Sequence, residues 1–120
     1  MVFQRDARYV VDMARSRRQI EVQIESIKKE LCSLGRLHPG SLSKQYTVCG
    51  KASCGCADSP RKRHGPYHQL SFTRGGKSTT RFVRKDQVAA VKQRLRTYKR
   101  LQSLVERWVK LEMQLGQIEP

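Results

Sequence analysis

Apolar residues recur every three or four positions at both ends of the 120-residue chain, and this spacing constrains the fold more than any other feature. The first seam contains Val10, Met13, Ile20, Ile24, Ile27, Leu31 and Leu34, with Arg17 as a polar interruption. The second contains Val88, Val91, Leu95 and Tyr98 and, after a slip of three residues, Leu101, Leu104, Trp108, Leu111, Leu115 and Ile118. This a/d spacing predicts two amphipathic helices, over residues 8–35 and 86–118.

The pattern changes between the two helices. Residues 67–73 and 78–84 are rich in aromatic and β-branched side chains and are separated by Arg-Gly-Gly-Lys, which predicts a β-hairpin. A two-residue turn would set Leu70 opposite Arg81, whereas a three-residue loop would set Leu70 opposite Phe82. We expect the three-residue loop, because it pairs apolar with apolar. The outward face would then interleave short hydroxyls with cations, which suits phosphate contacts.

Before the predicted hairpin, four soft metal ligands fall within sixteen residues: Cys49, Cys54, Cys56 and His64. Cys and His are the donors of structural zinc sites, which close all four positions with protein groups, so we expect a structural zinc ion here. The C-x4-C-x-C spacing is not a common zinc pair, and an unmetallated thiol cluster or iron–sulfur or redox chemistry are the alternatives. His68 is the rival fourth ligand. Cys32 is expected to be a small buried hydrophobic residue.

Together these elements predict an α+β fold: two long helices, as an antiparallel hairpin or a coiled coil, flanking a small zinc-knuckle and β-hairpin head. We expect a single domain over residues 1–120, with the Cys-rich knuckle and β-hairpin at 45–85. The alternative to pairing of the two helices within one chain is a homodimer formed through the same apolar seams.

The chain has a net charge of +15, which indicates a polyanionic partner, and nucleic acid is the first expectation. From Arg36 to Lys85 there are eleven basic residues and one acid, Asp58. The side chains expected to contact phosphates are Arg61, Lys62, Arg63, Arg74, Lys77, Arg81, Arg84, Lys85, Lys92 and Arg96. They would make one continuous cationic face if the knuckle packs on the hairpin.

The sequence shows no apolar run long enough for a signal peptide or a membrane span, so we expect a cytoplasmic protein without membrane contact. In a reducing compartment, clustered thiols favour metal over disulfides. An enzyme is not expected, because the middle third has only Asp58 to hold catalytic metal ions. A zinc or redox enzyme, with one open zinc position, is the residual alternative.

The motif Y-x-x-C-G-K-x-x-C-x-C followed by H-G-P-Y, then a strand, R-G-G-K, a second strand and a helix, resembles an uncharacterised family of small basic bacterial and archaeal proteins. These proteins are often encoded near mobile genetic elements. The resemblance covers about Gln45 to Tyr98. In that family an aromatic residue commonly follows the Tyr, where this chain has His68. This departure makes His64 the better ligand candidate. The resemblance implies a shared knuckle-plus-hairpin core and a mobile-element context, but no activity.

The resulting hypothesis is a nucleic-acid-binding accessory protein of a mobile element, whose zinc-stapled basic head contacts the phosphate backbone. DNA is favoured over RNA on the mobile-element resemblance alone, because we expect no paired aromatic platform for single strands. A recombinase or nuclease of the same element is the expected protein partner. The alternatives are an RNA-binding protein and a structural subunit of a ribonucleoprotein or protein assembly.

Overall fold

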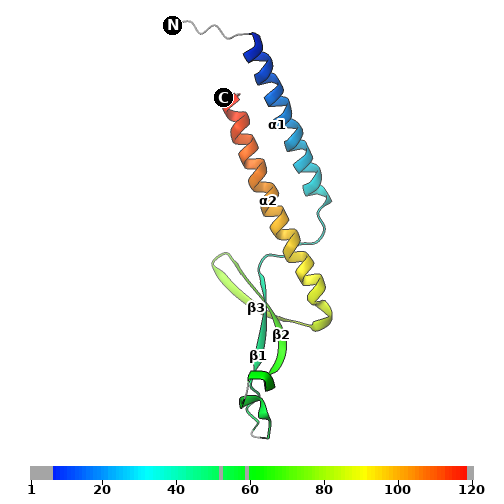
Figure 1. Ribbon diagram of the computed structural model, residues 1–120, viewed down its shortest axis with the longest axis vertical. Coiled ribbons are helices and arrows are strands. Elements are labelled where there is room, and N and C mark those ends of the chain that lie inside the picture. The colour runs from blue at the N-terminus through cyan, green and yellow to red at the C-terminus, as the bar shows by residue number, and fades with distance from the viewer. Residues whose placement is uncertain (1–6, 52, 59, 119–120) are drawn as a thin grey trace. The chain divides into compact units, whose positions relative to one another are not determined.

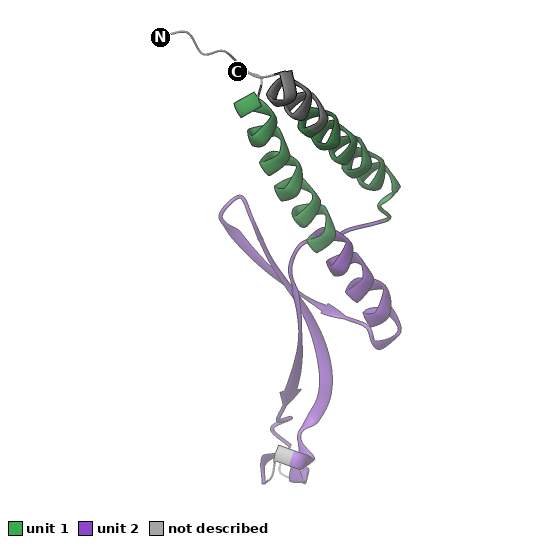
Figure 2. Ribbon diagram, turned by 45° about the horizontal axis from the view of Figure 1, so that its top comes forward, with its two compact units in different colours: residues 1–35, 99–120 green, residues 36–98 purple. Residues whose placement is uncertain are grey.

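The computed structural model describes residues 7–51, 53–58 and 60–118 (Figure 1). Along the chain, the helices and strands are α1 (Ala7–Ser33), β1 (Ser41–Thr47), β2 (His64–Arg74), β3 (Lys77–Val83) and α2 (Val88–Ile118). Three short 3₁₀ turns join them: η1 (Gly55–Ala57), η2 (Pro60–Lys62) and η3 (Lys85–Gln87). The chain divides into two compact units (Figure 2): unit 1 comprises residues 1–35 and 99–120, and unit 2 comprises residues 36–98.

Unit 1 is held together by the apolar seams of α1 and of the C-terminal part of α2. Its buried core consists of Ile20, Ile24, Ile27, Leu104 and Leu111, with Leu31, Leu34, Trp108, Leu115 and Ile118 packed around it. Spacings of three and four residues place these side chains on one face of each helix, which explains why they meet. The side chains of Val10 and Met13, which the predicted seam also included, lie outside the part of the chain that the structure describes.

Unit 2 contains a three-stranded antiparallel sheet in the order β1-β2-β3, covered on one face by the first turns of α2. Leu70 in the central strand is only 3% exposed and packs with Val91 and Leu95 of α2. Leu42, Phe72 and Val83 surround this cluster. The segment before β1 is also tied to α2, because the His38 N–H donates to the Arg94 carbonyl at 3.1 Å. The sheet and the beginning of α2 therefore share one core.

The predicted fold class, two long helices flanking a zinc knuckle and a β-hairpin, is wrong. The middle of the chain forms a three-stranded sheet, and its first strand, β1, was not expected. The helices also do not simply flank this region: α1 is the shorter one, and α2 begins as the cover of the sheet. The sequence pattern missed this because the apolar positions of α2 resume after the slip that follows Tyr98, although the first part of the helix faces strands rather than a helix.

The register expected for β2 and β3 is also wrong. Leu70 lies opposite Arg81, and Arg74 lies opposite Lys77, so the loop is the two-residue turn Gly75–Gly76. Both glycines have positive φ, 57° and 76°, which is the conformation that tight hairpin turns of this length require. The physical reason for the error is that α2, not a cross-strand aromatic partner, buries Leu70.

The outward hydroxyls consequently have partners other than those expected. Ser71 lies opposite Thr80 and Thr73 opposite Ser78, so the hydroxyls pair with each other and do not interleave with cations. No helix among the described residues is long and apolar enough to cross a membrane.

Candidate metal centre

The three cysteines and His64 come together at one end of the sheet. Cys49 follows β1, Cys54 and Cys56 lie at the turn η1, and His64 is the first residue of β2. Because Thr47 of β1 is paired with His64, the loop between the two strands must leave and return at the same place. The four donor atoms lie within 4.8 Å of one another.

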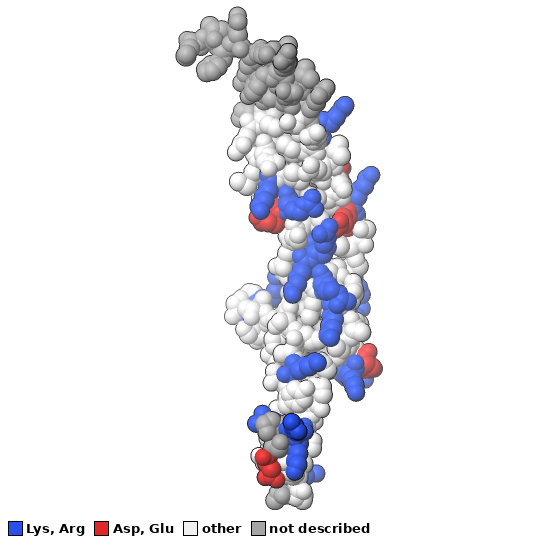
Figure 3. Space-filling view, viewed as in Figure 1, with Lys and Arg blue, Asp and Glu red and all other residues white. Residues whose placement is uncertain are grey.

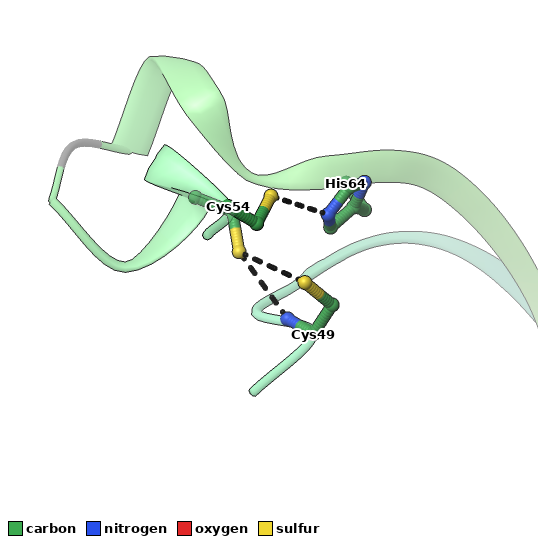
Figure 4. Close-up of side chains that lie close together, drawn as sticks. Cys49, Cys54 and His64 are labelled. Atoms are coloured by element: carbon green, nitrogen blue, oxygen red, sulfur yellow. Dashed lines mark hydrogen bonds between the residues drawn. The ribbon is translucent and has the colours of Figure 1, made fainter. Parts of the chain in front are cut away.

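The separations of these atoms fit a single tetrahedral metal ion. The Sγ atoms of Cys49 and Cys56 are 3.5 Å apart, and Sγ of Cys54 lies 3.3 Å from Nε2 of His64 (Figure 4). Zinc–sulfur bonds of about 2.3 Å at tetrahedral angles require sulfur atoms about 3.8 Å apart, inside the observed range. The four residues could therefore hold a metal ion, and a set of three thiols and one imidazole suits zinc.

The site is partly shielded from solvent. Cys56 is 1% exposed, Cys54 and His64 are half-buried, and Cys49 is exposed. Gly50 makes the turn beside Cys49 with a φ of 72°, a conformation that costs other residues energy. Cys56 is buried although it belongs to neither hydrophobic cluster of the described residues. Burial of a cysteine in a loop without an apolar core is typical of a turn that a metal ion stabilises.

The hydrogen bonds of the cluster separate the acidities of two thiols. A backbone hydrogen bond with Lys51, helped by the Cys56 thiol and by His64, lowers the pKa of Cys49 to about 6. At Cys54 a backbone hydrogen bond with Cys56 lowers the pKa, but the thiols of Cys56 and Cys49 outweigh it and raise the pKa overall. Metal ligation requires thiolates, and the lowered pKa of Cys49 favours its thiolate form.

Two further expectations concerned His68, as the rival fourth ligand, and Cys32, as a buried residue. His68, the rival ligand, lies within the sheet opposite Lys44 and Val83, and it is not a member of the cluster. Cys32 is exposed near the end of α1, so the expectation that it is buried is wrong. Its neighbour Leu31 carries the seam, and the helix turns Cys32 toward solvent.

All ten basic residues expected to contact phosphates lie in unit 2, and all are exposed. They do not form one compact face, however. Arg61, Lys62 and Arg63 lie beside the metal cluster, whereas Arg74 and Lys77 flank the hairpin turn at the other end of β2. Since β2 has eleven residues, these two groups are about 33 Å apart at the usual rise per strand residue. The knuckle therefore lies at the end of β2 away from the hairpin turn, and these two groups of cations are not neighbours.

The other basic residues of this set lie elsewhere in unit 2. Arg81 is on the sheet face covered by α2, with its guanidinium 5.8 Å from the centre of the Phe72 ring. Arg84 and Lys85 follow β3, and Lys92 and Arg96 lie on the first part of α2. Lys and Arg side chains thus recur along the visible surface, with Asp and Glu at isolated places (Figure 3).

One of the cations lies against the knuckle. The side chain of Lys62 passes close to Gly55. If Gly55 carried a Cβ atom, that atom would lie 3.1 Å from Cδ and 3.5 Å from Nζ of Lys62. Gly55 sits between two of the cluster cysteines, Cys54 and Cys56. A metal ion that fixes this turn would therefore also fix the surface against which Lys62 lies.

Sequence reasoning missed three exposed aromatic residues of the sheet, one of which is Tyr46 of β1, 53% exposed. Phe82 is 75% exposed and Tyr67 is 45% exposed. The signal was available, because the rejected two-residue turn places Phe82 on the face opposite to Leu70.

The fold and site define a small α+β protein in which a Cys₃His cluster ends an antiparallel sheet that is covered by a helix. Residues 12–93 match the family described as "domain of unknown function (DUF6788)", and the chain belongs to this family. No curated protein and no solved structure matches the chain.

Proposed function

We propose that this protein binds nucleic acid through phosphate contacts made by unit 2, and that a structural zinc ion at Cys49, Cys54, Cys56 and His64 stabilises that unit. The observation that carries the proposal is the division of charge between the two units. Unit 2 has fourteen Lys and Arg against Asp58 and Asp86, a net charge of +12, which leaves only +3 for unit 1.

The excess charge cannot be neutralised within unit 2. With two carboxylates for fourteen cations, most of the basic side chains have no acidic partner in their own unit. Net charge of this size in a small unit opposes its folding by self-repulsion and favours a polyanionic ligand. The ion pairs Arg17–Glu21, Lys28–Glu25 and Arg100–Glu30 lie in unit 1, where acids and bases are nearly balanced.

The donor set supports a structural role for the metal rather than a catalytic one. Catalytic zinc sites keep one position open for water or substrate, whereas the fourth donor here, Nε2 of His64, lies with the three thiols. The sheet end and the loop that carries Arg61, Lys62 and Arg63 would be fixed by the same ion. The proposed zinc therefore acts on binding by holding cations in place.

DNA is the favoured ligand, on the mobile-element context that the sequence resemblance implies, and a recombinase or nuclease of the element would be the protein partner. The test is binding of the full chain to a labelled 25-base-pair duplex over a salt series. If about six phosphates are neutralised, the logarithm of the association constant should fall with the logarithm of the salt concentration, with a slope of about −5. Absence of binding at low salt to this duplex and to single strands would refute the proposal.

A structural subunit of an assembly is the second candidate, and one observation favours it. Val105, Val109 and Met113 are spaced by four residues on α2 and are 43%, 48% and 67% exposed. They form an apolar stripe separate from the buried seam of Leu104 and Leu111. A second copy of the chain would cover such a stripe in a helix–helix contact. Sedimentation of the wild type and of Val109→Glu would test this, since only a dimer through the stripe would dissociate.

A further inference from the structure

The sheet of unit 2 has one covered and one open face. In an antiparallel sheet, directly opposed residues project to the same side and successive residues alternate. Leu42, Leu70, Phe72 and Val83 share the side on which Val91 and Leu95 of α2 pack. The other side, here called the open face, consists of Ser41, Ser43, Gln45, Tyr67, Gln69, Ser71, Thr73, Ser78, Thr80 and Phe82. None of these ten residues belongs to a core cluster of the described chain.

Two aromatic rings are neighbours on this open face. Phe82 lies opposite Gln69, and Tyr67 precedes Gln69 by two residues, so the two rings occupy diagonal positions of adjacent strands. Diagonal positions are about 7–8 Å apart, within reach of aromatic side chains. Phe82 is 75% exposed, the highest value among the large hydrophobic residues described as exposed. An apolar ring held so far into water contributes little to the core, and with the neighbouring Tyr67 ring it is accessible to a ligand.

The rest of the open face is made of short polar groups. The hydroxyls of Ser71 and Thr80 lie 3.3 Å apart, and those of Thr73 and Ser78 lie 2.9 Å apart. These pairs lead from the aromatic rings toward the turn, where Arg74 and Lys77 are exposed. The open face therefore offers two rings and then hydroxyl donors and acceptors, and it ends beside Arg74 and Lys77, which project to the other side of the sheet.

We propose that the open face binds single-stranded nucleic acid, with unpaired bases stacking on Tyr67 and Phe82. This inference rests on the proposed function and names the form of ligand. Base–aromatic stacking on an open sheet combined with a cationic surround is a common way to bind unpaired strands. The bases of a duplex are already stacked on each other, so the rings offer a duplex much less.

Charge and composition favour a nucleic acid over a protein as the occupant. The net charge of +12 on unit 2 complements a phosphate backbone. Only two of the ten open-face residues are apolar or aromatic, fewer than the apolar core of a protein interface provides. RNA and DNA strands differ in the 2′-hydroxyl and, for uracil against thymine, in the C5-methyl group, so ribose and deoxyribose strands are separate arms of the test.

The test measures binding of the full chain to labelled 20-mers of deoxythymidine and of uridine, and to a 20-base-pair duplex. Phe82→Ala should weaken single-strand binding about tenfold or more and change duplex binding less than twofold. Phe82→Tyr, which keeps the ring, should retain wild-type affinity. Met113→Ala is the matched control, because it removes another large, highly exposed apolar side chain, 67% exposed, from unit 1.

Three other results would overturn the inference, and they separate it from the proposed function. Duplex and single-strand affinities that are both unchanged by Phe82→Ala and Tyr67→Ala would show that the open face is not the site, with the proposed function intact. No binding to any of the three ligands would remove both proposals. A Phe82→Ala variant that turns a dimer into a monomer, with unchanged single-strand affinity, would assign the face to contact between copies of the chain.

Discussion

Nε2 of His64 lies 3.3 Å from Sγ of Cys54, which joins the first residue of β2 to the turn that follows β1. The two residues are ten positions apart, and the intervening loop carries Arg61, Lys62 and Arg63. Closure of this loop by a metal ion would order its backbone and its charges together.

We expect the purified protein to contain about one zinc ion per chain, because the cluster supplies a single closed set of four donors. His64→Ala should weaken zinc binding by more than the roughly 10–100-fold that follows loss of an outer-shell partner. His68→Ala is the matched control and should retain the metal, since His68 lies outside the cluster. Elemental analysis and competition with a zinc chelator measure both quantities.

Removal of the metal should unfold the knuckle end of unit 2, because metal-binding free energy is coupled to folding. A chelator-treated sample that keeps the thermal melt of the untreated protein would contradict a structural role for the ion.

The loop cations should contribute directly to the salt dependence of duplex binding. Changing Arg61, Lys62 and Arg63 together to Ala should flatten the log–log slope by up to about 3 and weaken binding to all sequences alike. The control removes three exposed cations from unit 1, by changing Lys29, Arg107 and Lys110 to Ala. Fluorescence anisotropy over a salt series measures both slopes. Equal slopes for the two triple variants would show that the loop is not a contact site.

The ion pair between Glu30 and Arg100 should make unit 1 less stable in acid. The Arg100 guanidinium donates to Glu30 through Nε and, at 2.8 Å, through Nη2, and this holds the pKa of Glu30 below its ordinary value of 4.5. A lowered folded-state pKa means that the stabilisation is fully present above about pH 4.5 and is lost as pH falls through the folded-state pKa.

Arg100→Gln should therefore reduce the loss of stability between pH 5 and pH 3, measured as the change in denaturant midpoint. Arg107→Gln is the control, because Arg107 acts on Glu30 only through its charge and less strongly. An identical pH profile for Arg100→Gln and wild type would show that the pair contributes nothing measurable, as is common for exposed pairs.

The backbone conformations of Gly76, in the two-residue turn, and Gly116, in helix α2, predict opposite effects of substitution by Ala. Gly76→Ala should destabilise unit 2 by about 1 kcal/mol, because its φ of 76° disfavours a Cβ although nothing lies within 4 Å of one. Gly116→Ala, within helix α2 and equally free of neighbours, should stabilise the chain by about 1 kcal/mol. Chemical denaturation of both variants gives the signs, and a stabilising Gly76→Ala would contradict the turn.

Local patterns in the sequence located the helical segments and the cluster, because both depend on residues that are close along the chain. Seam spacing reports which residues share a helix face, and the cysteines with His64 need only one loop to meet. The sequence did not reveal β1, because Ser41–Thr47 is largely polar and only Leu42 reaches the core. A strand with one buried apolar residue shows no period of two.

The register of β2 and β3 could not be read from their own residues. Matching Leu70 with Phe82 is reasonable if the two strands must bury each other, but α2 supplies the cover instead. Sequence alone does not show that Val91 and Leu95 pack against the sheet while Leu104 packs against α1. The observed register places Phe82 beside Tyr67 on the open face. The wrong register therefore also hid this pair of exposed aromatic residues.

The shortness of the Gly75–Gly76 turn also limits how this family can tolerate insertions and deletions. Side chains of a strand alternate with a period of two, so one residue added here, with the turn kept at two residues, would exchange the two sides of β3. Arg81 would then replace Phe82 among the hydroxyls, and Phe82 would face α2. A relative with one more residue at this place would thus carry a cationic surface where this chain carries an aromatic one.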